Sequence, residues 1–131
     1  ASSAEITVEN PLPNVMGHHS TLKQVILNLM TNALKFVAAD RQPRIHVWAE
    51  HRSGWVRLWI RDNGIGIEPQ HQERVFQPFE RLHGVETYSG TGVGLAIVRK
   101  GIEKMSGKVG IESALGQGSQ FWIELREGDE R

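Results

Sequence analysis

Apolar residues recur every three or four positions between residues 20 and 37, which is the spacing of one face of an α-helix. Ser20 or Thr21 is suited to cap the start of this helix. A helix with one apolar face needs a second layer to pack against. The stripe comprises Leu22, Val25, Ile26, Leu29, Met30, Ala33, Leu34 and Val37.

The remaining pattern predicts a sheet as that second layer. Alternation and turn residues indicate strands over 5–8, 44–51, 55–62, 108–113 and 119–126, with a turn at Ser53-Gly54. A second helix is predicted over 93–105, ending at Ser106-Gly107, and a short one from Pro69 to Val75. For a chain of 131 residues we therefore expect one α+β domain, with a mixed five-stranded sheet and two or three helices on one face.

Composition excludes several classes of protein. Fifteen basic and 15 acidic residues balance, so no net charge points to nucleic acid or an anionic membrane. The chain has no cysteine, and its six histidines lack the spacing typical of zinc sites. Its longest apolar run is far shorter than the ~18 residues of a membrane span.

The first helix carries a polar face opposite its apolar stripe. Two asparagines sit in mid-helix, where Asn is an indifferent helix former, and a lysine follows three residues later. A solvated face is one explanation. An oxygen ligand beside a flexible cation also suits a Mg²⁺–phosphate group. The residues of this face are Gln24, Asn28, Thr31, Asn32 and Lys35.

A carboxylate ends the strand 55–62. Asp62 shares the parity of Val56, Leu58 and Ile60, so it points to the core side and needs hydrogen-bond donors. It could cap the strand in an Asx-turn, or it could accept from a ligand amine, with Gly64 and Gly66 leaving room for a flat ring. Ser119 has the inward parity of its own strand and could add a hydroxyl to the same pocket.

Three alternating glycines, Gly90, Gly92 and Gly94, run into the second helix. Such a loop can turn backbone N–H groups toward an anion, and the helix N-terminus adds its dipole. The spacing is neither G-x-G-x-x-G nor a P-loop, so the loop alone identifies no family.

In sequence order, these motifs resemble the N, G1, F and G2 boxes of the ATP-binding catalytic domain of sensor histidine kinases. They are Asn-x-x-x-Asn-Ala-x-Lys-Phe (28–36), Asp-Asn-Gly-x-Gly-Ile (62–67), Phe76-x-x-Phe79 with Arg81, and Gly-Thr-Gly-x-Gly-Leu (90–95). The resemblance covers nearly the whole chain. It implies the two-layer α/β sandwich called the Bergerat fold, shared with type II topoisomerases, and it implies ATP and Mg²⁺ as cofactors.

The resemblance also implies a role for each matched residue. Asn32 would ligate Mg²⁺, Lys35 and Arg81 would contact phosphates, and Asp62 would accept from the adenine amino group. Asn28 takes the position where hydrolytic relatives keep a glutamate, and an amide cannot activate water. The remaining expected nucleotide contacts are Phe36, Gly64, Gly66, Ile67, Phe76, Gly90, Thr91, Gly92, Gly94, Leu95 and Ser119.

The histidine that such kinases phosphorylate is expected elsewhere, because none of the six histidines is followed by an acidic residue. We expect residues 1–131 to be the catalytic domain alone, monomeric when isolated. Its partner would be the His-containing dimerisation domain of a homodimeric two-component kinase that signals to a response regulator. We expect no nucleic-acid partner and a cytoplasmic location.

Two other functions stay open at this point. One is a serine kinase of the same superfamily, of the anti-sigma type, and the other is a degenerate module that binds partners without catalysis.

A further expectation concerns the sheet, where Trp48, Trp59 and Trp122 take the parity that points away from the helices. They either lie flat under long neighbours such as Arg57 and Arg61, or form a docking patch for another domain of the kinase.

Overall fold

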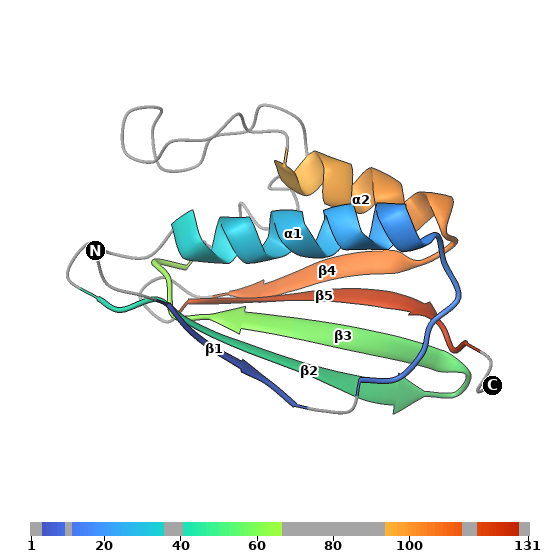
Figure 1. The fold of residues 1–131 in the computed structure, drawn as a ribbon, viewed down its shortest axis with the longest axis horizontal. Helices are drawn as coiled ribbons and strands as arrows, with labels where there is room; N and C mark the ends of the chain where they lie inside the picture. Colours follow the sequence, from blue (N-terminus) through green and yellow to red (C-terminus); the bar gives the residue numbers. More distant parts are fainter. Residues whose placement is uncertain (1–3, 10–11, 36–40, 67–93, 114–117, 129–131) are drawn as a thin grey trace.

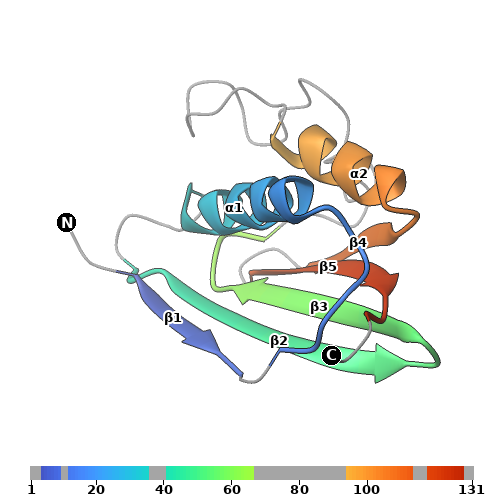
Figure 2. The same cartoon turned by 45° about the vertical axis from the view of Figure 1, so that its right-hand side comes forward.

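The fold is a single sheet with its helices packed on one face (Figures 1 and 2). The computed structural model describes residues 4–9, 12–35, 41–66, 94–113 and 118–128. Within them the five strands lie in the order β1-β2-β3-β5-β4, with β1 and β2 parallel and the other neighbours antiparallel. This confirms the α+β architecture with a mixed five-stranded sheet. The predicted helix from Pro69 to Val75 lies outside the described residues.

A tight hairpin joins the two strands that lead to the site. β2 (Arg44–Arg52) and β3 (Trp55–Asp62) pair from Arg52↔Trp55 to Ile45↔Asp62. Ser53 and Gly54 both have positive φ, 47° and 87°, as a two-residue turn between right-twisted strands requires. The predicted turn is confirmed, and it fixes the register that carries Asp62 to the far end of the sheet.

The other strands build outward from this hairpin. β1 (Glu5–Val8) pairs with β2 at one edge, while β5 (Ser119–Arg126) pairs with β3 and with β4 (Lys108–Ser113). The segment leading to the first helix is bonded to the end of β5, where Met16 N donates to Arg126 O at 2.8 Å and Gly128 N to Asn14 O at 2.8 Å. The sheet therefore holds the start of that helix in place.

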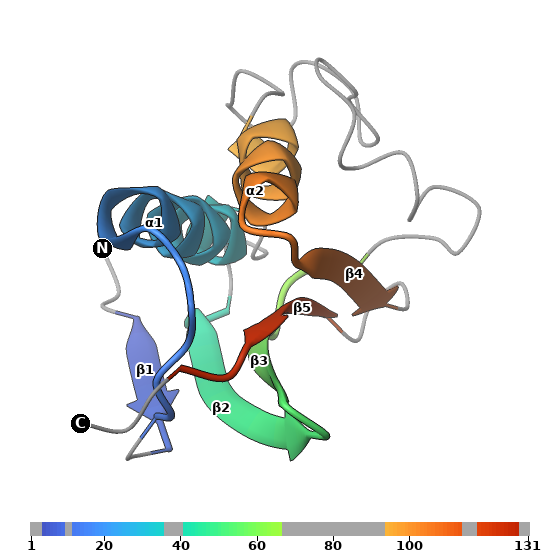
Figure 3. The ribbon, with the colours of Figure 1, turned by 90° about the vertical axis from the view of Figure 1, so that its right-hand side faces the viewer.

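The two described helices lie side by side and antiparallel, α1 (His19–Lys35) and α2 (Gly94–Lys104) (Figure 3). A Cβ on Gly101 would press against Val25 and Thr21, so glycine allows the two helices to approach closely. The prediction that Ser20 or Thr21 caps α1 was wrong. The helix begins one residue earlier, since Leu22 N already donates to His18 O at 2.9 Å.

α2 ends at the predicted residues. Gly107 N donates to Ile102 O at 2.9 Å and Ser106 N to Glu103 O at 3.0 Å, with Ser106 left-handed at φ 63°. This is the Schellman arrangement, which satisfies the last carbonyls of a helix. A Cβ on Gly107 would collide with the carbonyl of Glu124, so the chain needs glycine here to pass β5 and begin β4.

Neither described helix is long and apolar enough to cross a membrane.

The core lies between the helices and the inner face of the sheet. The stripe predicted on the first helix supplies its upper half, and alternate residues of β2, β3 and β5 supply the lower half. The buried residues of this cluster are Val25, Leu29, Ala33, Ile45, Val47, Ile60, Val98, Ile102, Phe121, Ile123 and Leu125.

The outer face of the sheet carries the three tryptophans in one cross-strand row, as predicted. Trp48 pairs with Trp59 and stacks on it at 5.8 Å between ring centroids, and Trp59 pairs in turn with Trp122. Trp59 is only 7% exposed although no helix covers this face among the described residues. Gly110 pairs with Trp122 and leaves room for its indole, because a Cβ there would collide with the ring.

Arginine side chains cover this row. Arg57 lies 3.7 Å from the centroid of Trp122 and is held by an ion pair with Glu124 at 3.0 Å, while Arg61 lies 4.9 Å from that of Trp48. The Trp59 indole N–H donates to the Glu50 carboxylate and, as the largest cause, lowers the pKa of that carboxyl. These contacts favour tryptophans covered by their neighbours over an open docking patch.

Replacing Trp59 with alanine should lower the free energy of unfolding by about 3 kcal/mol, because the buried ring leaves a cavity between its two neighbours. Trp55→Ala, at the hairpin end of the same strand, is the matched control and should cost less, since Trp55 is only partly buried. Urea denaturation followed by circular dichroism measures both. Equal losses in the two variants would show that the row does not act as a second, outer core.

Candidate functional site

Asp62 is a buried carboxylate at the end of the central strand β3. It is 7% exposed, and its Oδ1 accepts from Gly64 N at 2.9 Å and from Ser119 N at 3.1 Å. Both bonds go to one oxygen, so among the described residues Oδ2 keeps its lone pairs for another donor. The inward orientation predicted from strand parity is confirmed. The Asx-turn exists as well, so the two interpretations of Asp62 are compatible.

Glycines allow the backbone to close around this carboxylate. Gly118 has φ 81°, and a Cβ there would collide with the carbonyl oxygen of Asp62. The turn after β3 contains Gly64 and Gly66, both buried, the latter with φ 78°. The start of β5 can therefore approach Asp62 closely enough for Ser119 N to donate to it.

Two serine hydroxyls contact each other where β4 ends and β5 begins, next to the backbone that bonds Asp62. Ser119 Oγ lies 2.8 Å from Ser113 Oγ, which also donates to Gly118 O at 3.0 Å. Ser119 is buried, as its predicted inward parity requires. These contacts tie the ends of β4 and β5 together at the level of Asp62. The sequence analysis did not predict Ser113 or Gly118 as site residues, although the two glycines of Gly-Gln-Gly-Ser (116–119) indicate an unusual backbone conformation at this point.

The two asparagines of α1 lie one turn apart, Asn28 in the middle of the helix and Asn32 in its C-terminal half. The arrowhead of β3 lies beneath the C-terminal half of α1, and α2 begins above the middle of α1 (Figures 1 and 2). Asn28 and Asn32 are half-buried, and Asn28 Nδ2 is buried without a hydrogen-bond partner in the described structure. A buried polar atom without a partner is costly. The solvated-face interpretation therefore holds for Gln24 and Thr31, which are exposed, but not for Asn28.

The last described part of the candidate site is the N-terminus of α2. Gly94 is its first residue and Leu95 its second, and no acidic side chain lies in its first turn. The positive end of the helix dipole is thus not neutralised from within the helix, and it favours an anion.

Other predicted site residues lie outside what the structure describes. The backbone of Lys35 ends α1, but its side chain is not described. Of the described candidates, the structure brings Asp62, Gly64, Gly66 and Ser119 together, whereas Asn28 and Asn32 lie on α1 and Gly94 and Leu95 lie at the start of α2. The residues outside the description are Phe36, Ile67, Phe76, Arg81, Gly90, Thr91 and Gly92.

Comparison with known proteins settles the family. Residues 17–129 match the model of the histidine kinase-, DNA gyrase B- and HSP90-like ATPases. The chain belongs to this family. Curated relatives and solved structures that it resembles include sensor histidine kinases.

Among curated relatives, cyanobacterial phytochrome A of a Nostoc species is 43% identical over 97% of this chain and 16% of its own length. Sensor histidine kinase AruS of Pseudomonas aeruginosa is 41% identical over 83% of this chain and 11% of its own. The chain thus spans less than a fifth of these relatives. Among solved structures, the mycobacterial sensor histidine kinase MprB has a TM-score of 0.82 at 29% identity, covering 98% of this chain and 85% of that one.

Burial has an electrostatic consequence at Asp62. Desolvation raises the pKa of its carboxyl from 3.8 to about 6, and the two backbone N–H donors only partly offset this rise. The charged form is therefore unfavourable in the folded protein without a further donor. A ligand amine at Oδ2 would supply one.

The stability of the domain should consequently depend on Asp62 between pH 4 and pH 7. In this window the folded state still holds a proton at Asp62 that the unfolded state has released, so the contribution of Asp62 to stability falls as the pH rises. From the pKa rise to about 6 we expect a loss of about 2 to 3 kcal/mol across the window.

Asp62→Asn isolates this effect, because its amide oxygen can accept the same two N–H groups without a charge. Urea denaturation of both proteins at several pH values measures the difference between them. The variant should be as stable as the wild type near pH 4 and more stable at pH 7. A difference that stays constant across the range would contradict the raised pKa.

Proposed function

We propose that this domain binds Mg²⁺-ATP and donates the γ-phosphate to a histidine on a separate dimerisation domain. The observation that carries the proposal is Asp62, a buried carboxylate with one oxygen that no donor among the described residues occupies, at the end of β3 that lies beneath the C-terminal half of α1. The family supports ATP as the ligand. The sensor kinases among the relatives favour this function over an anti-sigma-type serine kinase or a degenerate module.

Asp62 Oδ2 would accept from the exocyclic amino group of adenine. Its Oδ1 is already held by backbone N–H groups, so the carboxylate is oriented before the ligand arrives. Gly64 and Gly66 would leave room for the flat ring, and Ser119 would add its hydroxyl to the pocket. Phe36, Ile67 and Phe76 would supply apolar contacts around the nucleotide.

The asparagines fit a metal–phosphate group. Asn28 Nδ2 has no partner among the described residues, and Asn32 offers an amide oxygen one turn further along the same face. Asn32 would hold Mg²⁺, which when bound neutralises charge on the phosphates. Lys35 and Arg81 would add positive charge at the phosphates.

The glycine-rich loop would enclose the triphosphate. Gly90, Thr91 and Gly92 precede the start of α2, so their backbone N–H groups and those of Gly94 and Leu95 could face the phosphates together with the helix dipole. Backbone N–H groups recognise phosphate without a charged side chain. The specificity for ATP would therefore come from Asp62 and not from this loop.

Asn28 favours phosphoryl transfer over hydrolysis. Its amide cannot take a proton from water, so it cannot act as the general base of an ATPase. Transfer to a histidine needs a positioned nucleophile and neutralised phosphates instead. Residues 1–131 would then be the catalytic domain of a larger kinase that is a homodimer, while the isolated domain is a monomer. The parent kinase would act in the cytoplasm and pass its phosphoryl group to a response regulator.

Asp62→Asn should weaken ATP binding by about tenfold or more, because an amide oxygen accepts less strongly than a carboxylate. Inosine triphosphate, which has a carbonyl in place of the adenine amino group, serves as the matched ligand. The wild type should prefer ATP to it, and the variant should lose this preference. Isothermal titration calorimetry with Mg²⁺ measures both ligands, and unchanged ATP affinity in the variant would overturn the adenine assignment.

The isolated chain should bind ATP but neither label itself nor hydrolyse ATP quickly. None of its six histidines is followed by an acidic residue as in an acceptor, and Asn28 takes the position of a base for water. Incubation with γ-labelled ATP and Mg²⁺, with and without a His-bearing dimerisation domain, tests this. Label should appear on the added domain, and a His→Ala version of that domain is the control. Acid-labile label on this chain alone would show that the acceptor is misplaced, and rapid phosphate release would refute the argument from Asn28.

A further inference from the structure

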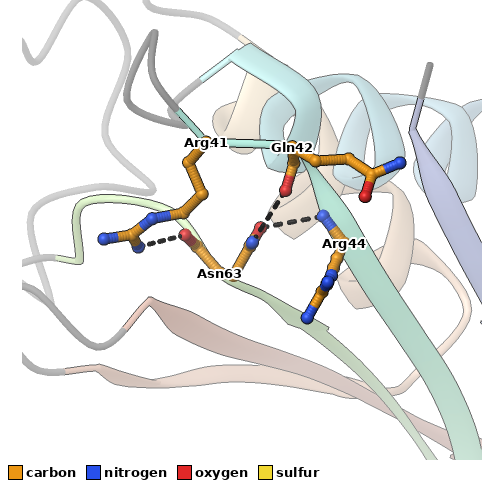
Figure 4. Close-up of a pocket in the computed structure, with 4 residues that line it drawn as sticks. All are labelled: Arg41, Gln42, Arg44 and Asn63. Atoms are coloured by element: carbon orange, nitrogen blue, oxygen red, sulfur yellow. Dashed lines mark hydrogen bonds between the residues drawn. The ribbon is translucent and has the colours of Figure 1, made fainter. Parts of the chain in front are cut away.

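A pocket of about 480 Å³ lies where the start of β2 meets the turn after β3 (Figure 4). It is lined by Arg41, Gln42, Arg44 and Asn63. None of the four residues takes part in the nucleotide site described above.

Asn63 fixes the floor of this pocket. Ile45↔Asp62 is the last pair of the β2–β3 ladder. Beyond it, the Asn63 side chain and not a strand backbone forms the hydrogen bonds to the start of β2 and the residues before it. Its Oδ1 accepts from Arg44 N at 2.8 Å and its Nδ2 donates to Gln42 O at 2.9 Å (Figure 4). Both amide atoms are thereby used, and the backbone that carries the two arginines is held in one position.

Two arginines line the pocket, and their guanidiniums lie on opposite sides of Asn63 (Figure 4). Arg41 Nη1 donates to Asn63 O at 2.7 Å, which orients the guanidinium but uses one of its five N–H donors. Arg44 Nε lies 4.0 Å from Glu5 Oε1, with both side chains about 60% or more exposed, so this ion pair is weak. Among the described residues that line the pocket there is no carboxylate, and Gln42 and Asn63 are neutral.

We propose that this pocket, the Arg41–Arg44 pocket, binds an oxyanion. A guanidinium presents paired N–H groups that match the oxygens of a carboxylate or a phosphate. Arg41 is already oriented by Asn63, which lowers the entropy lost on binding. The oxyanion would come either from a phosphate compound or from an acidic side chain of a protein segment.

The pocket is separate from the nucleotide contact of Asp62. Asp62 points into the core side of the sheet, whereas the Asn63 side chain reaches across to the start of β2. Binding of an oxyanion here therefore needs neither ATP nor Mg²⁺. The proposal can be tested without nucleotide, so its failure is distinguishable from failure of the proposed kinase function.

The experiment is an NMR titration of the ¹⁵N-labelled chain that follows the backbone amides and the arginine Nε–Hε groups. Sodium phosphate, sodium acetate and sodium chloride are added at matched ionic strength. We expect saturable shifts at Arg41, Arg44 and Asn63 with phosphate or with acetate. Saturation with phosphate alone identifies a phosphate ligand, and saturation with acetate identifies a carboxylate.

Variants connect the shifts to the two guanidiniums. Arg41→Gln should weaken the apparent affinity about tenfold, the usual effect of losing one charge-assisted hydrogen bond, and Arg44→Gln should weaken it less, because the Arg44 guanidinium lies on the other side of Asn63 and beside Glu5. Arg52→Gln is the matched control, since Arg52 is an exposed arginine at the other end of β2, and it should leave the affinity unchanged. Arg41→Lys keeps the charge but loses the fork, so it should retain only part of the affinity.

Two results would overturn the proposal. One is a set of shifts no larger than those caused by chloride, which would indicate screening alone. The other is saturable phosphate binding that moves Leu95 and its neighbours at the start of α2 and leaves Arg41 and Arg44 unchanged. That outcome would place the anion at the helix N-terminus.

Discussion

One buried carboxylate at the end of the central strand organises the contacts of this end of the sheet. Asp62 loses most of its hydration, and the folded chain returns only two hydrogen bonds, both to Oδ1. Those bonds come from the turn after β3 and from the first residue of β5, so two segments 57 positions apart must meet there. The close approach of Gly118 and the hydroxyl pair of Ser113 and Ser119 follow from this requirement. The incomplete compensation leaves the carboxylate available to a ligand donor.

The two faces of the sheet are protected in different ways, and both hold β3 rigid. The inner face is covered by α1 and α2, whereas the outer face is covered by a row of tryptophans with arginines lying over them. Since β3 is paired on both sides and buried on both faces, its end has little freedom to move. A recognition group on such a strand is oriented more accurately than one on a loop.

Strand alternation made most of this arrangement predictable from the sequence. The strand limits, the inward orientation of Asp62 and the outward row of Trp48, Trp59 and Trp122 all follow from a period of two. What failed depended on contacts between distant residues. The start of α1 was misjudged because the segment before it is held by β5 and by Met105, whose Sδ accepts from His18 N at 3.3 Å. Helical periodicity placed Asn28 opposite the apolar stripe, and it did not predict the half-burial of this side chain.

Asn63, which the sequence analysis placed in a turn, connects the end of β3 to the start of β2. A ladder that stops at Ile45↔Asp62 leaves backbone groups of β2 without partners, and the Asn63 amide satisfies one donor and one acceptor at once. Asp62 and Asn63 are adjacent in sequence but serve opposite sides, one toward the adenine position and the other toward the two arginines. An oxyanion on Arg41 would act on the carbonyl of Asn63 and hence on the turn that supplies Gly64 N to Asp62. Any such coupling must be reciprocal, so nucleotide bound at Asp62 would change the affinity of the Arg41–Arg44 pocket by the same factor.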